Sequence, residues 1–73
     1  MSPRLPVVSG QDAIRALRAA GFRQISQRGS HVKLRNDEGQ TAIVPLKREL
    51  APGTLRSILR QANLSIEEFA NLL

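Results

Sequence analysis

The spacing of apolar and polar residues along the chain predicts six short elements of regular structure. Residues 9–21 have apolar side chains at helical spacing and predict an amphipathic helix: Ala13, Ile14, Leu17 and Ala20. Ser9 stands where an N-cap belongs, with Asp12 three residues later to complete a capping box. Gly21 can end the helix in the left-handed conformation that glycine tolerates.

The middle of the chain changes to a strand-like pattern. Residues 22–28 and 31–35 predict two strands joined by Gly29-Ser30. In the second strand Val32 and Leu34 alternate with the polar positions, so the two sets are expected on opposite faces of a sheet. Residues 36–40, "NDEGQ", predict a turn, and residues 41–45, "TAIVP", predict a third strand. The order predicts an antiparallel meander.

Helical spacing returns in the last part of the chain. Pro52 suits the first turn of a helix whose apolar face is Leu55, Ile58, Leu59 and Ala62. A second capping box, Ser65 with Glu68, predicts a short last helix. The expected fold is therefore α+β, in the order α-β-β-β-α, with two helices on one face of a three-stranded antiparallel sheet. A chain of 73 residues is expected to form one domain, with residues 1–8 as an N-terminal tail or short extended segment.

The charge balance indicates the class of partner. Eleven Lys and Arg against six Asp and Glu give a net charge of +5, and nine of the eleven cations are arginine. Arginine suits bidentate phosphate contacts, so nucleic acid is the first expectation. A basic surface that only keeps the protein dissolved is the alternative. The lack of cysteine excludes disulfides and thiol chemistry and fits the reducing cytoplasm, and no apolar run approaches the roughly 20 residues of a membrane span.

His31 is the only histidine, and it opens the second predicted strand. Its expected face also carries Lys33 and Arg35. Imidazole titrates near pH 6.5, so it can exchange a proton at neutral pH, and cleavage of an RNA phosphodiester needs such a group beside cations. A lone histidine is more commonly a surface or hydrogen-bonding residue, and that interpretation stays open. The acids are scattered through turns and caps, so neither a metal ion nor another cofactor is expected.

Several short motifs occur together in this chain. The stretches "AAGF", "QRGSHVKL" and "TAIVPLKRELAPGTLRSILRQANLSIEEF" resemble the HicA toxin family, the ribonuclease half of HicAB toxin–antitoxin modules. The Gly-Ser-His triplet, the Val-Pro strand end and the Gly-Thr-Leu-Arg-Ser-Ile-Leu helix stand in the family's order and spacing. The resemblance extends from about residue 9 to residue 70. Each motif is weak alone, and the combination is specific.

The resemblance implies a fold like that of double-stranded-RNA-binding domains. It also implies metal-independent cleavage of mRNA, with His31 as the essential residue, and a HicB-type antitoxin that covers the active surface. Many members carry a second histidine where this chain has Lys47, and an ammonium that titrates near 10.4 is a poor base. Water or a second copy of the chain could supply the second proton-transfer role. The expected RNA contacts are Arg28, Gly29, Ser30, Lys33, Arg35 and Lys47.

Two other interpretations remain open at the level of sequence. One is a double-stranded-RNA-type binding module that performs no chemistry, since the same fold and charge serve both functions. The other is a protein-interaction domain whose basic face binds an acidic partner. His31 discriminates between them, because a pure binding module has no use for a titrating group on its cationic face.

Overall fold

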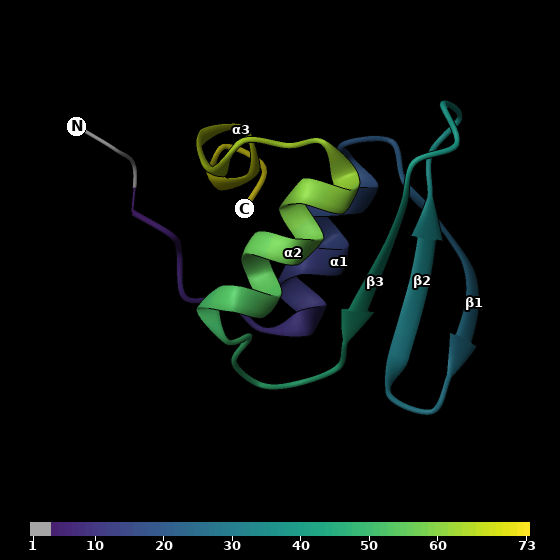
Figure 1. The fold of residues 1–73 in the computed structure, drawn as a ribbon, viewed down its shortest axis with the longest axis horizontal. Coiled ribbons are helices and arrows are strands. Elements are labelled where there is room, and N and C mark those ends of the chain that lie inside the picture. Colours follow the sequence, from purple (N-terminus) through teal and green to yellow (C-terminus); the bar gives the residue numbers. More distant parts are fainter. Residues whose placement is uncertain (1–3) are drawn as a thin grey trace.

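The structure, a computed structural model, describes residues 4–73, so the first three residues of the predicted N-terminal tail lie outside the described part. Its elements follow the expected α-β-β-β-α order with a short last helix (Figure 1). They are α1 Gly10–Ala19, β1 Arg23–Arg28, β2 His31–Arg35, β3 Thr41–Pro45, α2 Pro52–Ala62 and α3 Ile66–Ala70. The predicted α+β fold, like that of double-stranded-RNA-binding domains, is confirmed.

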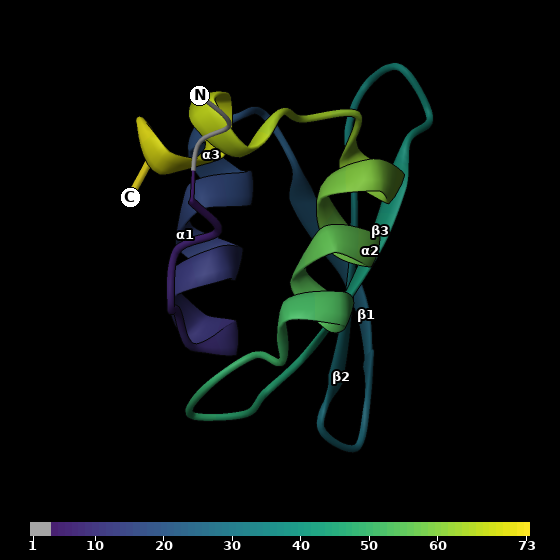
Figure 2. The ribbon, with the colours of Figure 1, turned by 60° about the vertical axis from the view of Figure 1, so that its left-hand side comes forward.

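The three strands form one antiparallel sheet in the order β1-β2-β3. Both long helices lie on the same side of this sheet and contact β3, while β1 is the strand farthest from them (Figure 1). Turning the molecule shows α1 and α2 side by side in one layer (Figure 2). All six residues of β1 are exposed. On the face that carries the helices, the helix layer therefore covers β3, and β1 projects beyond that layer.

The core lies between the helices and the inner face of the sheet. Val32 and Leu34 of β2 are 2% and 0% exposed, and they face the apolar sides of the helices. The buried helix residues include Leu17 of α1, Leu55 of α2 and Phe69 of α3. This is the alternation and the helical spacing that the sequence predicts. The apolar contacts fix which face of β2 remains available to a ligand.

The predicted helix ends are confirmed. The hydroxyl of Ser9 accepts from the N–H of Asp12 at 3.0 Å, and the carboxylate of Asp12 accepts from the N–H of Ser9 at 3.1 Å. Ser65 and Glu68 repeat the arrangement with 2.9 Å for both bonds. The backbone N–H and then the hydroxyl of the capping serine lower the pKa of each carboxyl. Gly21 ends α1 with φ 97°.

Gly10 brings the start of α1 against the end of β3. A Cβ at this position would lie 2.1 Å from the carbonyl oxygen of Pro45, so only glycine permits the approach. The N–H of Gly10 donates to the carbonyl of Lys47 at 2.8 Å. Val8, just before the helix, is buried, and its carbonyl accepts from the N–H of Leu50 at 2.8 Å. The end of β3 is thus held against the helix layer.

The pairing of β1 with β2 contains one irregularity. Gln24 is opposite Leu34 and Ser26 is opposite Lys33, so the register shifts between them. Ile25 is the extra residue, which makes the shift a β-bulge. A bulge disturbs the ladder along an edge strand and so discourages another chain from pairing with it. The other edge is protected differently, since the side chain of Gln61 accepts from the N–H of Ile43 at 3.0 Å.

Candidate nucleic-acid interface

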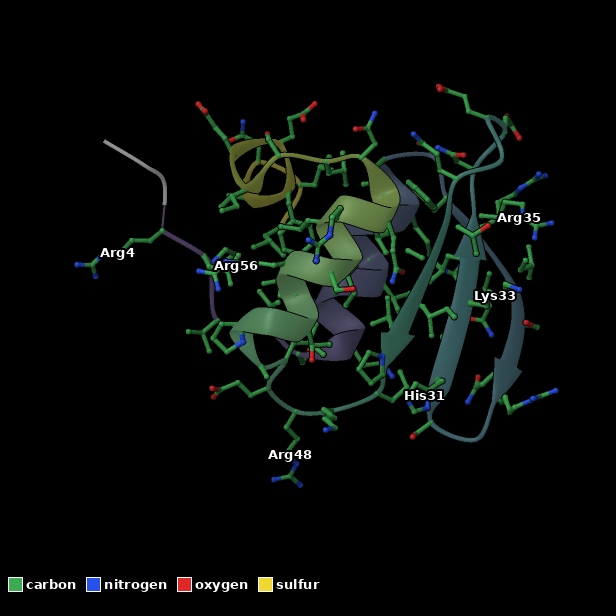
Figure 3. The ribbon with its side chains drawn as sticks, viewed as in Figure 1. Arg4, His31, Lys33, Arg35, Arg48 and Arg56 are labelled. Carbon is green, nitrogen blue, oxygen red and sulfur yellow. The ribbon has the colours of Figure 1, made fainter. Side chains whose placement is uncertain are left out.

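The outer face of β2 carries a row of basic side chains. His31, Lys33 and Arg35 follow one another along this strand, on the face turned away from the helices (Figure 3). His31 and Arg35 are exposed and Lys33 is half-buried. No polar or charged side chain of residues 4–73 is fully buried, so His31 is not a core histidine. The predicted division of β2 into an apolar and a basic face is confirmed.

A hollow of about 470 Å³ lies beside His31 on this face. Besides His31 and Lys33 it is lined by Ser26 and Arg28 of β1 and by Ile43 of β3. The strand register explains this set, because residues opposite each other in an antiparallel pair share a face. Arg28 is opposite His31, while Ser26 and Ile43 flank Lys33 from the two sides. All three strands therefore contribute to the site.

The turn before His31 is held from both sides. Gly29 has φ 57° and Ser30 has no positive φ, which is the pattern of a type II′ hairpin turn with glycine at its first position. The carbonyl of Ser30 accepts from the N–H of Leu46 at 2.7 Å, which ties the turn to the segment after β3. Because His31 is also paired with Pro45, its backbone is fixed between two neighbours. A group placed in this way is suited to a role that needs constant geometry.

The lining of the hollow is cationic. Arg28 and Lys33 are the charged residues of the lining, and no carboxylate belongs to it. At the other end of β2, away from the hollow, Asp37 forms an ion pair with Arg23 at 3.2 Å. Two cations without a neutralising acid favour a bound phosphate. The electrostatics of the hollow therefore fit the backbone of a nucleic acid.

The predicted contact residues do not all gather at one point. Arg28, His31 and Lys33 line the hollow, with Gly29 and Ser30 as the turn beside it. Arg35 extends the row, and its Nε donates to the hydroxyl of Thr41 at 3.2 Å. Lys47 is exposed in the segment after β3 and does not belong to the lining. The lining thus contains Arg28, His31 and Lys33 of the predicted set, and the other predicted residues lie outside it.

Two lining residues are missing from the set that the sequence predicts, Ser26 and Ile43. The alternation in "TAIVP" contains the signal for Ile43, since Ala42 and Val44 are buried and the residue between them must face outward. Ser26 follows from the register of a two-residue hairpin closed by Arg28 and His31. Both residues could have been predicted by pairing the three predicted strands in an antiparallel sheet.

Positive charge alone does not distinguish this face. Arg4, Arg48 and Arg56 lie around the helices and the connecting segment, well away from the row on β2 (Figure 3). What sets the outer face apart is the combination of an exposed imidazole, two cations in the same hollow and no acid. Within residues 4–73, no three His, Asp or Glu side chains gather where they could hold a metal ion. None of the helices in that range has the length and apolar character needed to cross a membrane.

Comparison with known proteins identifies the family. The chain matches none of the curated proteins with which it was compared. A family model described as "HicA toxin of bacterial toxin-antitoxin" matches residues 10–64, which is well over half of the 73 residues. The matched range begins with the first residue of α1, includes all three strands and the hollow around His31, and ends just after α2. The chain therefore belongs to the HicA family, the toxins of bacterial toxin–antitoxin modules.

Proposed function

We propose that this toxin is a metal-independent endoribonuclease that cleaves mRNA, with His31 as the proton-transfer residue. The observation that carries the proposal is the placement of the chain's one imidazole, exposed in a hollow with Arg28 and Lys33 and with no carboxylate in the lining. An enzyme that cuts RNA without a metal needs a titrating group and cations at one phosphate. The hollow offers that combination in a region that all three strands hold in place.

The chemistry follows from the RNA backbone itself. The 2′-oxygen of one nucleotide attacks the adjacent phosphorus, its proton passes to a base, and a cyclic phosphate forms. The bond to the 5′-oxygen of the next nucleotide breaks, and that oxygen takes a proton from an acid. The imidazole of His31 is suited to either transfer. Arg28 and Lys33 would bind the non-bridging phosphate oxygens and stabilise the charge that develops there.

The chain itself offers no second histidine as the partner of His31 in proton transfer, because it has only one. Lys47 lies outside the hollow and is a less suitable candidate than its position in the sequence suggests. Water, or a group from a second copy of the chain, would complete the pair. Ser26 lies in the hollow beside Lys33 and could orient that water through its hydroxyl.

The decisive experiment compares the wild-type chain with His31→Ala. We expect cleavage of purified RNA to fall by about 10²–10⁴-fold, the usual contribution of general acid–base catalysis, and growth arrest to disappear. EDTA should leave the wild-type activity unchanged. Arg56→Ala, which removes a cation on the helix side, is the matched control and should cleave like the wild type.

Three results would contradict the proposal. A His31→Ala protein that still cuts RNA removes the catalytic role of the imidazole. Activity that stops with chelator and returns with Mg²⁺ means that the reaction uses a metal. A wild-type protein that binds RNA and never cuts it favours the double-stranded-RNA-type binding module, which the same fold serves equally well.

Neutralisation by a HicB-type antitoxin is the second part of the proposal. An acidic protein would associate rapidly with a toxin of net charge +5, and the usual specific interface buries about 800 Å² on each side. We expect it to cover His31, Lys33 and Arg35. Hydrogen exchange on the purified pair should protect the β1–β2 hairpin and leave α1 less changed. Protection confined to α1, with residue 31 open to RNA, would indicate neutralisation by another route.

A further inference from the structure

A second cleft lies behind the site, on the helix side of the sheet. It has a volume of about 320 Å³ and is formed between α1 and the projecting strand β1. Small-molecule sites begin at roughly this size, which is enough for one base and its sugar. The cleft shares no lining residue with the hollow around His31. It is therefore a separate feature of the surface that the proposed reaction does not use.

The β-bulge creates the polar rim of this cleft. Gln24 and Gln27 are three residues apart, so in a regular strand their side chains would point to opposite faces. The extra residue at Ile25 changes this. Gln24 is opposite Leu34 and Gln27 is opposite Val32, and both partners face the helices. The bulge thus places two amide side chains on the same side of the sheet, in the same cleft.

The lining has the chemistry of a nucleotide site. Its floor is apolar, since Ile14 and Val32 are buried and Leu46 is half-buried. Exposed amides and guanidinium groups complete the lining: Gln24, Gln27, Arg15 and Arg18. A flat base can lie against the apolar floor, while an amide offers one donor and one acceptor to its edge. Arg15 is paired with Asp12, whereas Arg18 makes a 3.5 Å hydrogen bond to Gln24. Arg18 is accordingly the better placed of the two for a phosphate.

The cleft lies close to the proposed point of cleavage. Gln27 immediately precedes Arg28, which is opposite His31, and Val32 immediately follows His31. Because neighbouring residues of a strand point to opposite faces, the floor of the cleft begins directly across the sheet from the imidazole. β1 is an edge strand and pairs only with β2 in the described chain. An RNA strand that passes around this edge can therefore reach both surfaces.

We propose that the cleft between α1 and β1 binds one base of the single-stranded RNA next to the cleaved phosphate and so sets the sequence preference of the toxin. Adenine is the best matched base, because a glutamine amide pairs with it in bidentate fashion. This inference rests on the proposed ribonuclease function. It assigns specificity to the helix side of the sheet and proton transfer to the outer face.

The test maps cleavage positions on an RNA of mixed sequence with the wild type and Gln24→Met. Methionine keeps the length of the side chain and removes the amide. We expect the wild type to favour adenine at one position beside the cut. In the variant this preference should be about tenfold smaller, as for the removal of one hydrogen bond of about 1.4 kcal/mol. Gln40→Met is the control, since Gln40 lies in the turn at the other end of β2 and should leave the preference unchanged.

Arg18→Gln provides an independent variant on α1, and thermal unfolding shows that each protein is folded. On the inactive His31→Ala background, a short adenine-rich RNA should shift the side-chain amide signals of Gln24 and Gln27 in an NMR titration, and a uridine-rich one should shift them less. A wild type that cuts no RNA overturns the proposed function itself. A wild type that cuts, with the same preference in Gln24→Met and Arg18→Gln, overturns only the cleft. The proposal for the cleft is also overturned if these variants change only the binding of the antitoxin.

Discussion

The two faces of β2 are built from alternate residues of the same five-residue strand, and they have opposite environments. On the inner face Val32 and Leu34 are almost completely buried against the helices. On the outer face His31 and Arg35 are exposed, and Lys33 is half-buried beside Ser26 and Ile43. Adjacent residues are thus separated by the thickness of one strand. The inner residues stabilise the fold. The outer residues are not part of the core, so their side chains are available for chemistry.

This separation explains how so small a chain can carry a site. A domain of this size buries only about 60% of its unfolded surface, so it has little stability to lose. A polar group in the core would be costly, and the described residues contain none. The proposed chemistry instead uses the face that makes no contact with the helices. Substitutions on the inner face should therefore lower stability, whereas substitutions on the outer face should lower the affinity for RNA.

The largest effect is expected on the inner face. Leu34→Ala should lower the free energy of unfolding by about 2–5 kcal/mol, because it removes a buried side chain and leaves a cavity. Domains of this length have roughly 4–11 kcal/mol in total, so much of the protein should unfold. Urea unfolding on the inactive His31→Ala background measures the change. Lys33→Ala, one residue away, is the matched control and should stay within about 0.5 kcal/mol. Equal losses in the two variants would contradict the division between faces.

A smaller effect is expected on the outer face, in RNA affinity. Lys33→Ala and Arg35→Ala should each weaken binding by about twofold to fivefold, as for an exposed ion pair of ~0.5–1 kcal/mol. Each should also make the salt dependence of binding less steep, by about 0.7 for every phosphate that the variant no longer neutralises. Gel shifts at two salt concentrations on the His31→Ala background measure both quantities.

Two further variants sharpen the same measurement. Lys47→Ala tests the predicted RNA-binding residue that the structure places outside the hollow, and we expect it to weaken binding less than Lys33→Ala. Arg56→Ala lies on the helix side and should have no effect beyond the loss of one charge. If all four variants behave alike, RNA responds to the overall charge of the protein and not to the outer face of the sheet.

The smallest effect concerns stability and pH at the start of α1. Hydrogen bonds from the backbone and hydroxyl of Ser9 lower the pKa of Asp12 in the folded protein. A lowered folded pKa contributes stability above the unfolded value of about 4, and this is lost as the pH falls through the folded value. The stability difference between the wild type and Asp12→Asn should therefore shrink as the pH is lowered from 7 to 3 in urea unfolding. Arg56→Ala should show a constant difference over this range, and a growing difference for Asp12→Asn would reverse the assigned sign.

Local signals were sufficient to predict most of the fold. The capping serines Ser9 and Ser65, the glycine at residue 21 and Pro52 mark helix ends through short-range hydrogen bonds and backbone preferences, and these operate within one turn. The alternation in β2 fixed which residues face the core, because burial of Val32 and Leu34 admits only one orientation. The orientation of His31 followed from the same rule.

The pattern of a single strand does not show how that strand pairs with its neighbours. Ser26 and Ile43 enter the hollow because they lie on either side of Lys33, which is a property of the sheet. Lys47 follows the last strand by two residues, and its distance from the hollow depends on how the segment after Pro45 turns toward Gly10. The lining of the hollow therefore differs from the predicted set of site residues at positions where separate segments of the chain meet.

The elements, their order, the apolar face of each and the place of His31 among cations can be predicted from the sequence. These features depend on periodicity and on contacts over a few residues. The bulge in β1, and the shared face of Gln24 and Gln27 toward α1, become visible only in the folded chain. Nothing in "RQISQR" distinguishes a regular strand from a bulged one, since every residue of β1 is exposed and no buried position fixes the register. The pairing with β2 sets that register, and it creates the cleft on the far side of the sheet from His31.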